Sequence, residues 1–517
     1  MKIVSVAQMK AIEKSAFDAG IAYETMMEQA GGGVADWILA HLDAKRGVIG
    51  LVGSGNNGGD TLIALTRMAE KGYRTQAFLV RPRENDPLVG AYQDLGGNVL
   101  DLTARTPLDY LSAALTPGTI LLDGMLGTGF HLPLRGALKA LMAQIQEVVR
   151  RRPEIQVIAV DCPSGVDCDS GEVTSQCLKA DYTLTMAAAK QGLLHEPANE
   201  YAGQIHLVDI GIGGVEQYTS VPLPVLMDHS LASSLLPKRP ETGHKGTFGT
   251  CLVVAGTRQY TGAAYLTGKA AYRAGCGLVN VATRSDVRDS LSGRLIEAVW
   301  TILPEQGQGY HPSGIDLLRS PVEKAAALVM GPGWGVQAAN QEFLEALLSI
   351  LPNELPTVID ADGLKLLTGI DQWWQKVPDQ TVLTPHPGEM AQLTGLSIGK
   401  IQANRWEIAS KYAGEWGVTL VLKGALTVIA MPGGELVISP ISDSALGTAG
   451  SGDILTGVIG GLMAQGLNAH DSAILGVWLQ GQAGIQAHHC FGDPACVTAL
   501  DILNALPKAT RQTKRPV

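Results

Sequence analysis

The sequence predicts two consecutive α/β domains, each containing a parallel sheet. Short β-branched runs alternate with longer amphipathic segments along most of the 517 residues, a pattern typical of strands joined by crossover helices. The alternation lapses between Gly211 and Gly246, where four prolines interrupt the chain, and it then restarts. A chain of this length also exceeds what a single core usually holds. We therefore expect a first domain over residues 1–225 and a second over residues 226–517.

The individual elements follow from these runs. In the first domain we expect strands at 48–52, 75–80, 120–122, 156–160, 182–185 and 205–208. Helical periodicity there is clearest over 61–71 and 136–151. In the second domain we expect strands at 250–255, 328–330, 357–360, 381–383 and 418–422. The turn Pro432-Gly433-Gly434 predicts a hairpin with arms 427–431 and 435–439, and an apolar helix follows from Ile454.

Composition limits the classes of function. Hydrophobic residues make up 46% of the chain and charged residues 17%, so each domain can bury a core. The net charge is −10 and the basic residues cluster only near the C-terminus, which disfavours nucleic acid as a partner. No apolar run is long enough to span a membrane, and the N-terminus lacks the apolar segment of a signal peptide. The seven cysteines include no CxxC pair, which favours reduced thiols and a cytoplasmic protein.

A glycine-rich loop follows the first of these strands, with the sequence GSGNNGGD over residues 53–60. Residues 53, 55 and 58 satisfy GxGxxG, whose glycines let a pyrophosphate approach a helix N-terminus. The next strand ends in Val80-Arg81-Pro82-Arg83, without the acidic residue that an ordinary dinucleotide site uses for the ribose. A tight turn without a ligand is the alternative. The polar residues Asn56, Asn57 and Asp60 favour a ligand site.

Two further strands of the first domain end in polar residues. Asp123 precedes the loop 127–130 (Gly-Thr-Gly-Phe), and Asp161 precedes Ser164. Because ligands bind beyond the carboxyl ends of parallel strands, we expect these residues to converge on one site. Asn57, Asp123 and Ser164 offer hard oxygens, which suit an alkali or alkaline-earth cation better than zinc. The alternative is that each polar side chain only stabilises its own loop.

These motifs together resemble the NAD(P)H-hydrate epimerase family, which is Rossmann-like and interconverts the R and S forms of hydrated NADH and NADPH. The resemblance implies a three-layer Rossmann-like fold for the first domain. It implies that Asp161 lies at the reacting centre, and that Asn57, Asp123 and Ser164 hold a potassium ion. The residues implied to contact the hydrate are Asn56, Asn57, Gly58, Gly59, Asp60, Gly127, Thr128, Gly129, Phe130, His131, Leu132, Pro133 and Asp161.

In the second domain, Gly450-Ser451-Gly452-Asp453 stands directly before the expected apolar helix. Its amides predict an anion site at the helix N-terminus, where the helix dipole favours negative charge. Asp453 can accept a proton from a hydroxyl that attacks a phosphoryl group; the alternative is that it serves only as the N-cap. The loop from Lys423 to Thr427 adds a cation at a strand end, and His386 lies between two prolines after another strand.

The second domain resembles the ribokinase-like superfamily and, more narrowly, ADP-dependent NAD(P)H-hydrate dehydratases. The matching strings are 236–239 through 244–246, 260–263, 331–333, 385–389 and 423–424, together with the Gly-Ser-Gly-Asp motif. The resemblance implies hydrate contacts by Ala263, Gly333, His386 and Asp453. It implies contacts to the AMP part of ADP by Lys423, Gly424, Ala425, Leu426, Thr427 and Gly452.

We therefore expect a fused enzyme that repairs hydrated NAD(P)H. The first domain would epimerise NADHX and NADPHX, and the second would dehydrate the S form with ADP and Mg²⁺, releasing AMP and phosphate. Asp161 and Asp453 are the expected catalytic residues, and a homo-oligomer is expected. One alternative is a ribokinase-like small-molecule kinase fused to a nucleotide-binding module. Another is that the first domain is a non-catalytic ligand or partner module.

Overall fold

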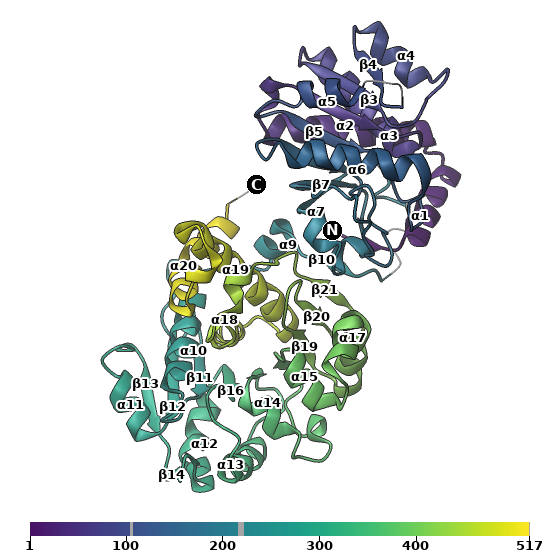
Figure 1. Cartoon of the computed structure of the whole chain (residues 1–517). Coiled ribbons are helices and arrows are strands. Elements are labelled where there is room, and N and C mark those ends of the chain that lie inside the picture. Colours follow the sequence, from purple (N-terminus) through teal and green to yellow (C-terminus); the bar gives the residue numbers. More distant parts are fainter. Residues whose placement is uncertain (104–106, 216–221, 516–517) are drawn as a thin grey trace. The chain divides into compact units, whose positions relative to one another are not determined.

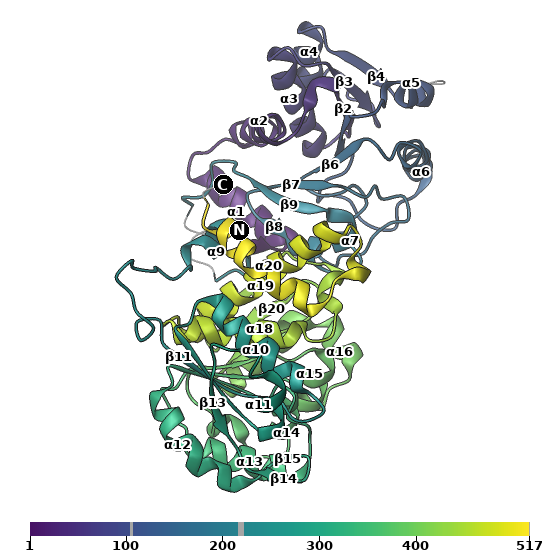
Figure 2. The same ribbon diagram turned by 90° about the vertical axis from the view of Figure 1, so that its left-hand side faces the viewer.

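The computed structural model describes residues 1–103, 107–215 and 222–515. The chain divides into two compact units, Met1–Pro224 and Val225–Val517, shown in Figures 1 and 2. Within the described residues, no helix has both the length and the apolar character that a membrane span requires. Each unit is an α/β domain, as the alternation of elements predicts.

The first unit contains a parallel sheet in the order β4-β3-β2-β5-β6-β7-β9. Because β2 is the first of these strands in the chain, the order reverses between β2 and β5, as in Rossmann-like folds. The strands are β2 (Val48–Val52), β3 (Thr75–Leu79), β4 (Asn98–Asp101), β5 (Ile120–Gly124), β6 (Gln156–Val160), β7 (Tyr182–Met186) and β9 (Gln204–Val208). A small separate sheet pairs β1 (Ile3–Val4) with β8 (Ala189–Lys190).

Helices cover both faces of this sheet. Val48 and Val52 pack into one apolar cluster, whereas the alternate residues Ile49 and Leu51 pack into another on the opposite face. This arrangement explains why the strands read as continuous apolar runs, because both faces are buried. The helices of the unit are α1 (Val6–Asp18), α2 (Tyr23–His41), α3 (Asn56–Glu70), α4 (Pro87–Asp94), α5 (Pro107–Ala114), α6 (Gly136–Arg150) and α7 (Asn199–Ala202). The three-layer Rossmann-like prediction is confirmed.

The second unit contains a larger mixed sheet in the order β10-β21-β20-β19-β18-β17-β16-β11-β12-β13. Only the β19-β20 and β20-β21 pairings in this sheet are antiparallel, and β20 and β21 form the predicted hairpin. The strands are β10 (Val225–Leu226), β11 (Thr250–Val254), β12 (Leu278–Thr283), β13 (Val299–Ile302), β16 (Ala327–Met330), β17 (Thr357–Ile359), β18 (Thr381–Leu383), β19 (Thr419–Leu422), β20 (Val428–Ala430) and β21 (Leu436–Ile438). The short strands β14 (Glu305–Gln306) and β15 (Gly309–Tyr310) form a separate hairpin.

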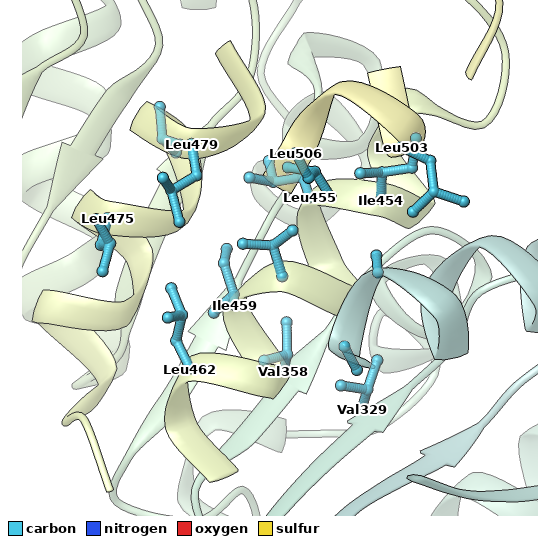
Figure 3. Close-up of a cluster of buried hydrophobic side chains, with 14 of the residues drawn as sticks. Val329, Val358, Ile454, Leu455, Ile459, Leu462, Leu475, Leu479, Leu503 and Leu506 are labelled. Atoms are coloured by element: carbon cyan, nitrogen blue, oxygen red, sulfur yellow. The ribbon is translucent and has the colours of Figure 1, made fainter. Parts of the chain in front are cut away.

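The core of the second unit lies between the sheet and a layer of apolar helices (Figure 3). Val329 and Val358 of the sheet meet Ile459 and Leu462 of α18 (Ser451–Ala464) in this cluster. The helices of that layer include α10 (Thr261–Ala274), α19 (Ala469–Phe491) and α20 (Ala499–Thr513). The remaining helices are α9 (His229–Ser234), α11 (Ser285–Leu291), α12 (Ile315–Lys324), α13 (Ala338–Leu348), α14 (Asp362–Leu367), α15 (Pro387–Thr394), α16 (Ile398–Ala403) and α17 (Arg405–Trp416).

The structure corrects the sequence prediction in two respects. The strands β4, β12 and β13 and the two-residue strands β1, β8, β10, β14 and β15 were not predicted. Asn98 and Asp101 in β4 and Asn280 in β12 interrupt the apolar pattern, and the two-residue strands are too short to show one. In addition, α3 begins at Asn56 and α18 at Ser451, several residues earlier than predicted. Glycine has a low helix propensity, so both glycine-rich starts look like loops in sequence although the fold holds them as helical turns.

Candidate functional site

The glycine-rich loop of the first unit lies at the point where the strand order reverses, between β2 and β5. Two of its glycines are required by contacts with the protein's own backbone. A Cβ on Gly58 would lie 2.0 Å from the Gly53 carbonyl oxygen, and one on Gly53 would lie 2.0 Å from the Met125 carbonyl oxygen. Gly55 differs, because a Cβ there would meet nothing within 4 Å. Gly53 and Gly58 therefore close the turn, whereas Gly55 leaves space beside it.

Arg83 secures this loop from the end of β3. Its guanidinium donates hydrogen bonds to the carbonyl oxygens of Gly53 (2.6 Å) and Gly55 (3.0 Å) and to the carboxylate of Asp86 (2.6 Å). Arg83 thus stands where an ordinary dinucleotide site has its ribose-binding acid, and it supports the backbone of the loop. The sequence shows an arginine at this position, but only the fold shows what it contacts.

Beside the loop is a cavity of ≈700 Å³, a size suited to a nucleotide-like ligand. Many of the residues predicted to contact a hydrate line it: Asn56, Asn57, Asp60, Gly127, Thr128, Gly129, Phe130, His131, Pro133 and Asp161. Three others, Gly58, Gly59 and Leu132, are not among the lining residues. Gly58 faces the turn, Gly59 faces the Met27 side chain, and Leu132 packs against the apolar cluster beneath the loop. Hydrate contact by all of these residues stays a prediction, and the cavity lining supports it for the residues that face the cavity.

The three predicted cation ligands form one buried group next to the cavity. The Asp123 carboxylate accepts hydrogen bonds from the Ser164 amide (2.8 Å) and from the Ser164 hydroxyl. The Leu126 peptide joins Asn57 to this pair, because its carbonyl oxygen accepts from Asn57 Nδ2 (2.9 Å) and its amide donates to Ser164 Oγ (2.9 Å). Burial raises the pKa of Asp123, and the hydrogen bonds from Ser164 oppose that rise.

One oxygen of this group is left without a partner. The Oδ1 atom of Asn57 is buried and has no hydrogen-bond donor among the described residues. A buried amide oxygen without a donor is costly, and a cation can satisfy it. Asn57, Asp123 and Ser164 therefore have the chemistry of an alkali-cation site.

Asp161 lies on the cavity wall in an unusual backbone conformation, with φ of 64°. Its Oδ1 atom accepts hydrogen bonds from the Met186 amide (3.0 Å) and the Thr185 hydroxyl (3.3 Å), and it pairs with the Lys190 ammonium. The Lys190 side chain is only 2% exposed. Sequence reasoning missed Lys190, because a lysine that follows three alanines and precedes Gln191 carries no local mark of its burial.

Further acidic groups face the same cavity. Burial raises the pKa of Asp60 well above its usual value, and the charge of Asp161 raises it further, while Lys190 and Arg83 oppose the rise. Burial also raises the pKa of Glu13 in α1. The cavity therefore combines an ion-paired carboxylate, Asp161, with carboxyl groups that burial favours in the neutral form.

In the second unit, Asp360 and Lys423 form the centre of the polar site. Lys423 Nζ lies 2.8 Å from Asp360 Oδ1 and 3.7 Å from Glu389 Oε2. The second oxygen of Asp360 accepts a hydrogen bond from the Thr456 hydroxyl of α18 (2.6 Å). A Cβ on Gly452 would lie 3.4 Å from Lys423 Nζ, so the helix start is directly beside this pair. The sequence analysis included Lys423 and Gly452 but missed Asp360 and Glu389 as site residues.

His386 is the N-cap of α15. Its Nδ1 atom accepts hydrogen bonds from the amides of Gly388 (3.0 Å) and Glu389 (3.2 Å). Burial lowers the pKa of His386, and the charge of Lys423 lowers it further. The ring is therefore favoured in the neutral form with its proton on Nε2, which can donate to a ligand.

Asp453 lies in the first turn of α18, where the N-cap is Gly450 with φ of 89°. The alternative of Asp453 as the N-cap is therefore wrong. Burial raises the pKa of Asp453 to about 7, with a further contribution from the charge of Asp360, while Lys423 opposes the rise. A carboxyl group with a pKa near neutrality suits a general base.

The remaining predicted residues of the second unit lie in two groups. Gly424, Ala425, Leu426 and Thr427 form the loop between β19 and β20; Gly424 and Ala425 are exposed, and the Leu426 side chain is buried. Ala263 in α10 and Gly333, which has φ of 67°, touch one another, since a Cβ on Gly333 would lie 2.9 Å from the Ala263 Cβ. Gly333 is also held through its carbonyl oxygen, which accepts from the Thr257 hydroxyl (2.8 Å).

Family models match both units. Residues 23–192 match the model described as YjeF-related protein N-terminus, and residues 251–508 match the model described as NAD(P)H-hydrate dehydratase. Among solved structures, a hypothetical protein from Streptococcus mutans has a TM-score of 0.50 and 26% identity, covering 56% of this chain and 100% of that one. The ADP/ATP-dependent NAD(P)H-hydrate dehydratase of Bacillus subtilis, co-crystallised with ATP and Mg²⁺, has a TM-score of 0.49 and 27% identity, covering 56% and 99%. The second unit has the predicted ribokinase-like α/β fold.

Full-length relatives contain both units in the same order. The bifunctional NAD(P)H-hydrate repair enzyme of Moorella thermoacetica is 36% identical over 527 residues, covering 100% of this chain and 98% of the relative. The enzyme of the same description from Escherichia coli K12 is 31% identical, covering 94% of this chain and 89% of the relative. The similarity extends across both polar sites described above. This chain therefore belongs to the family of bifunctional NAD(P)H-hydrate repair enzymes.

Proposed function

We propose that this chain repairs hydrated NADH and NADPH through two reactions, one in each unit. The first unit interconverts the R and S epimers of the hydrate, and the second uses ADP to dehydrate the S epimer, releasing AMP and phosphate. The observation that carries this proposal is the alignment with the Moorella enzyme over 100% of the chain, which includes both polar sites. A kinase fused to a binding module is not favoured, because such a chain would not match a two-activity enzyme throughout.

For epimerisation, the cavity of the first unit would bind the hydrate with Asp161 next to the C6 hydroxyl. The Asp161 carboxylate accepts the hydroxyl proton, the O–H electrons form a C6 carbonyl, and the C6–N1 bond breaks. Its electron pair stays on N1, where conjugation with the carboxamide delocalises it. After rotation about C5–C6, N1 attacks the other face of the carbonyl and Asp161 returns the proton. The lining residues of loops 54–57 and 127–133 would hold the nucleotide meanwhile.

A potassium ion would be held by Asn57, Asp123 and Ser164, as the unpartnered Asn57 Oδ1 supports. When bound, the ion supplies a fixed positive charge at the base of the nucleotide loops. It would satisfy the Asn57 oxygen and favour the ionised form of Asp123. We assign the ion a role in binding the nucleotide, because two of its ligands, Asn57 and Ser164, hydrogen-bond the Leu126 peptide, which precedes the loop 127–133.

For dehydration, Asp453 would take the proton of the C6 hydroxyl as that oxygen attacks the β-phosphorus of ADP. The bond between the β-phosphorus and the bridging oxygen breaks, and AMP leaves. The hydrate is now a phosphate ester: the N1 electrons expel inorganic phosphate, C5 loses a proton, and the C5–C6 double bond is restored. Phosphate is a far better leaving group than hydroxide, which explains the need for a nucleotide.

The other residues of this site have supporting roles in the proposal. The amides at the start of α18 around Gly452 would bind phosphate oxygens, and the loop from Lys423 to Thr427 would hold the AMP part. The Nε2–H of His386 would donate to the hydrate, which Ala263 and Gly333 would contact from the opposite side of the site. Mg²⁺ would be bound through the phosphate oxygens of ADP, and it would supply charge neutralisation during transfer.

The decisive experiment mixes the protein with pure S hydrate of NADH, Mg²⁺ and ADP. The absorbance band of reduced nicotinamide should return, and phosphate should appear in equal amount. A stable phosphorylated nucleotide would support the kinase alternative instead. With pure R hydrate, the absorbance should return only if the first unit converts R hydrate into S hydrate. A return no faster than spontaneous epimerisation would indicate that the first unit only binds a ligand.

The homo-oligomer and the cytoplasmic location stay predictions.

A further inference from the structure

Lys190 is a buried cation whose hydrogen-bonding capacity is used entirely by the protein. It ends β8, and its ammonium donates to the Asp161 carboxylate, to the Met186 carbonyl oxygen (3.0 Å) and to the Thr185 hydroxyl (3.3 Å). A lysine ammonium has three N–H groups, so these three acceptors account for all of them. Lys190 lines the cavity but has no N–H left for a ligand. Its action on a ligand must therefore pass through another residue.

That residue is Asp161, whose two carboxylate oxygens differ. Oδ1 receives hydrogen bonds from Lys190, the Met186 amide and the Thr185 hydroxyl. Within the described part of the chain, no hydrogen bond to Oδ2 is formed, and the Asp161 side chain is 15% exposed at the cavity wall. The backbone of Asp161 has φ of 64°, a conformation that non-glycine residues rarely adopt and that the surrounding structure must hold in place. One oxygen is thus fixed to the protein, and the other is available to the hydrate.

Packing alone does not explain this arrangement. Burying an ammonium is costly, and a buried ion pair often stabilises a fold no more than an apolar replacement does. Burial lowers the pKa of Lys190, but the charge and hydrogen bond of Asp161, together with the nearby Cys162 and Cys168, raise the pKa overall. Lys190 therefore stays charged and provides a permanent positive charge against one oxygen of Asp161.

We propose that Lys190 is the positioning residue of the epimerase, holding Asp161 through Oδ1 so that Oδ2 can accept the hydroxyl proton of the hydrate. This inference rests on the proposed epimerase function. The proton moves from the C6 hydroxyl to Asp161 and back again, and Lys190 keeps its own protons throughout. Glu13 of α1 and Asp60 of α3 face the same ion pair. Burial raises the pKa of both carboxyl groups, and the charge of Lys190 opposes that rise.

The test compares Lys190→Met with Lys190→Arg in the full-length chain, using pure R hydrate of NADH as substrate. Lys190→Met should lower kcat for epimerisation by about 10²-fold at neutral pH with KM little changed, since a displaced catalytic group costs about this much. The acid limb of the kcat profile should move to higher pH, because the charge that favours the carboxylate is gone. The titratable groups facing the pair are Glu13, Asp60, Cys162 and Cys168. Lys190→Arg keeps the charge and should leave the acid limb in place.

The matched control is Lys14→Met, which removes an exposed lysine of α1 that does not line the cavity and should leave the acid limb unchanged. The Tm of the first unit's transition reports whether that unit is folded in each variant, and the dehydratase rate on S hydrate reports the amount of protein. An unchanged kcat and acid limb in Lys190→Met would overturn the inference. So would an equal loss at every pH accompanied by lost hydrate binding and a lower Tm, which indicates a purely structural role.

A double variant covers the case in which Lys190→Met does not fold. Asp161→Asn/Lys190→Met leaves no buried charge unpaired. If Lys190 acts only through Asp161, this double variant should epimerise no more slowly than Asp161→Asn alone. A further loss in the double variant would contradict the inference. Failure of the proposed function is distinguishable, because then the unmodified chain itself would not accelerate epimerisation.

Discussion

Lys423 Nζ lies 2.8 Å from Asp360 Oδ1, although the two residues are 63 positions apart in the chain. Burial raises the pKa of Asp360, but the nearby charge and hydrogen bond of Lys423 lower it overall. Glu389 and Asp453 share the same ammonium, and both have raised pKa values. The charge of Lys423 therefore lowers the pKa of all three carboxyl groups, and of the three only Asp360 ends below its usual value. Burial, with a further contribution from the charge of Asp360, raises the pKa of Asp453 to about 7, where it can act as a base.

Dehydration should depend on the ionisation of Asp453. Because the base form is the carboxylate, the single-turnover rate should rise with pH and level off above about 7. Asp453→Asn should lower that rate by roughly 10²–10⁴-fold and abolish the rise. Absorbance recovery from S hydrate measures both effects. Epimerisation of R hydrate by the same variant should stay normal and serves as the control.

The same variant has an expected effect on stability. A carboxyl group whose pKa is raised by folding contributes stability fully below its unfolded pKa, and that contribution is lost as the pH rises through about 7. At pH 8, Asp453→Asn should therefore unfold at the same or a higher denaturant concentration than the unmodified chain. Reduced stability at pH 8 together with lost ADP binding would mean that Asp453 mainly supports the helix start. Full dehydration by the variant would exclude Asp453 as the base.

Removing Lys423 should destabilise the second unit. Lys423→Met leaves Asp360 buried without its cation, which typically costs about 3–5 kcal/mol of unfolding free energy. Denaturant titration that follows the unfolding transition of the second unit measures this loss of stability. Lys423→Met/Asp360→Asn should recover part of the loss, because no buried charge then remains unpaired. The control is Lys269→Met, which breaks the Lys269–Glu297 pair with a half-exposed glutamate and should cost no more than about 1 kcal/mol. Equal costs for the two lysines would contradict the assignment.

The glycines of the nucleotide loop should differ in tolerance. Gly58→Ala places a Cβ 2.0 Å from the Gly53 carbonyl oxygen, so the loop must shift and epimerisation should be largely lost. Gly55→Ala meets nothing within 4 Å, and its φ of −93° suits any residue, so the fold should be retained. The Tm of the first unit's transition and the epimerisation rate are the measurements. A Gly58→Ala variant with a normal Tm and rate would show that the turn is less closely packed than described.

Hydrate binding should no longer depend on potassium when Asp123 is replaced. Replacing potassium by tetramethylammonium should weaken hydrate binding to the unmodified chain, because Asn57 Oδ1 then lacks its partner. Asp123→Ala removes the one formal charge of the three-residue group and should bind hydrate weakly with either cation. Calorimetric titration with the hydrate in both salts gives the comparison. Hydrate binding that is insensitive to both changes would eliminate the cation site.

Much of the fold was predictable because buried parallel strands are continuous apolar runs. β2, β6 and β18 lie at the predicted residues, since both of their faces are covered and nearly every position is apolar. β4 lies at a sheet edge, where polar residues such as Asn98 and Asp101 are tolerated, so no apolar run marks it. The starts of α3 and α18 were missed for a different reason, because glycine there is selected for close packing and not for helix propensity.

By itself, the sequence determined the two-domain α/β organisation, the family resemblance and the contiguous motifs that carry Asn57, Asp161 and Asp453. These features are local: each depends on residue types within a few positions of one another. Only the tertiary structure decided that Lys190 and Lys423 are buried partners of Asp161 and Asp360, because in sequence a buried lysine looks like a surface one. It also decided that Gly58 faces backbone while Asn57 Oδ1 lacks a partner. Burial and ion pairing depend on which distant segments the fold brings together, and this is why they cannot be read from residue order.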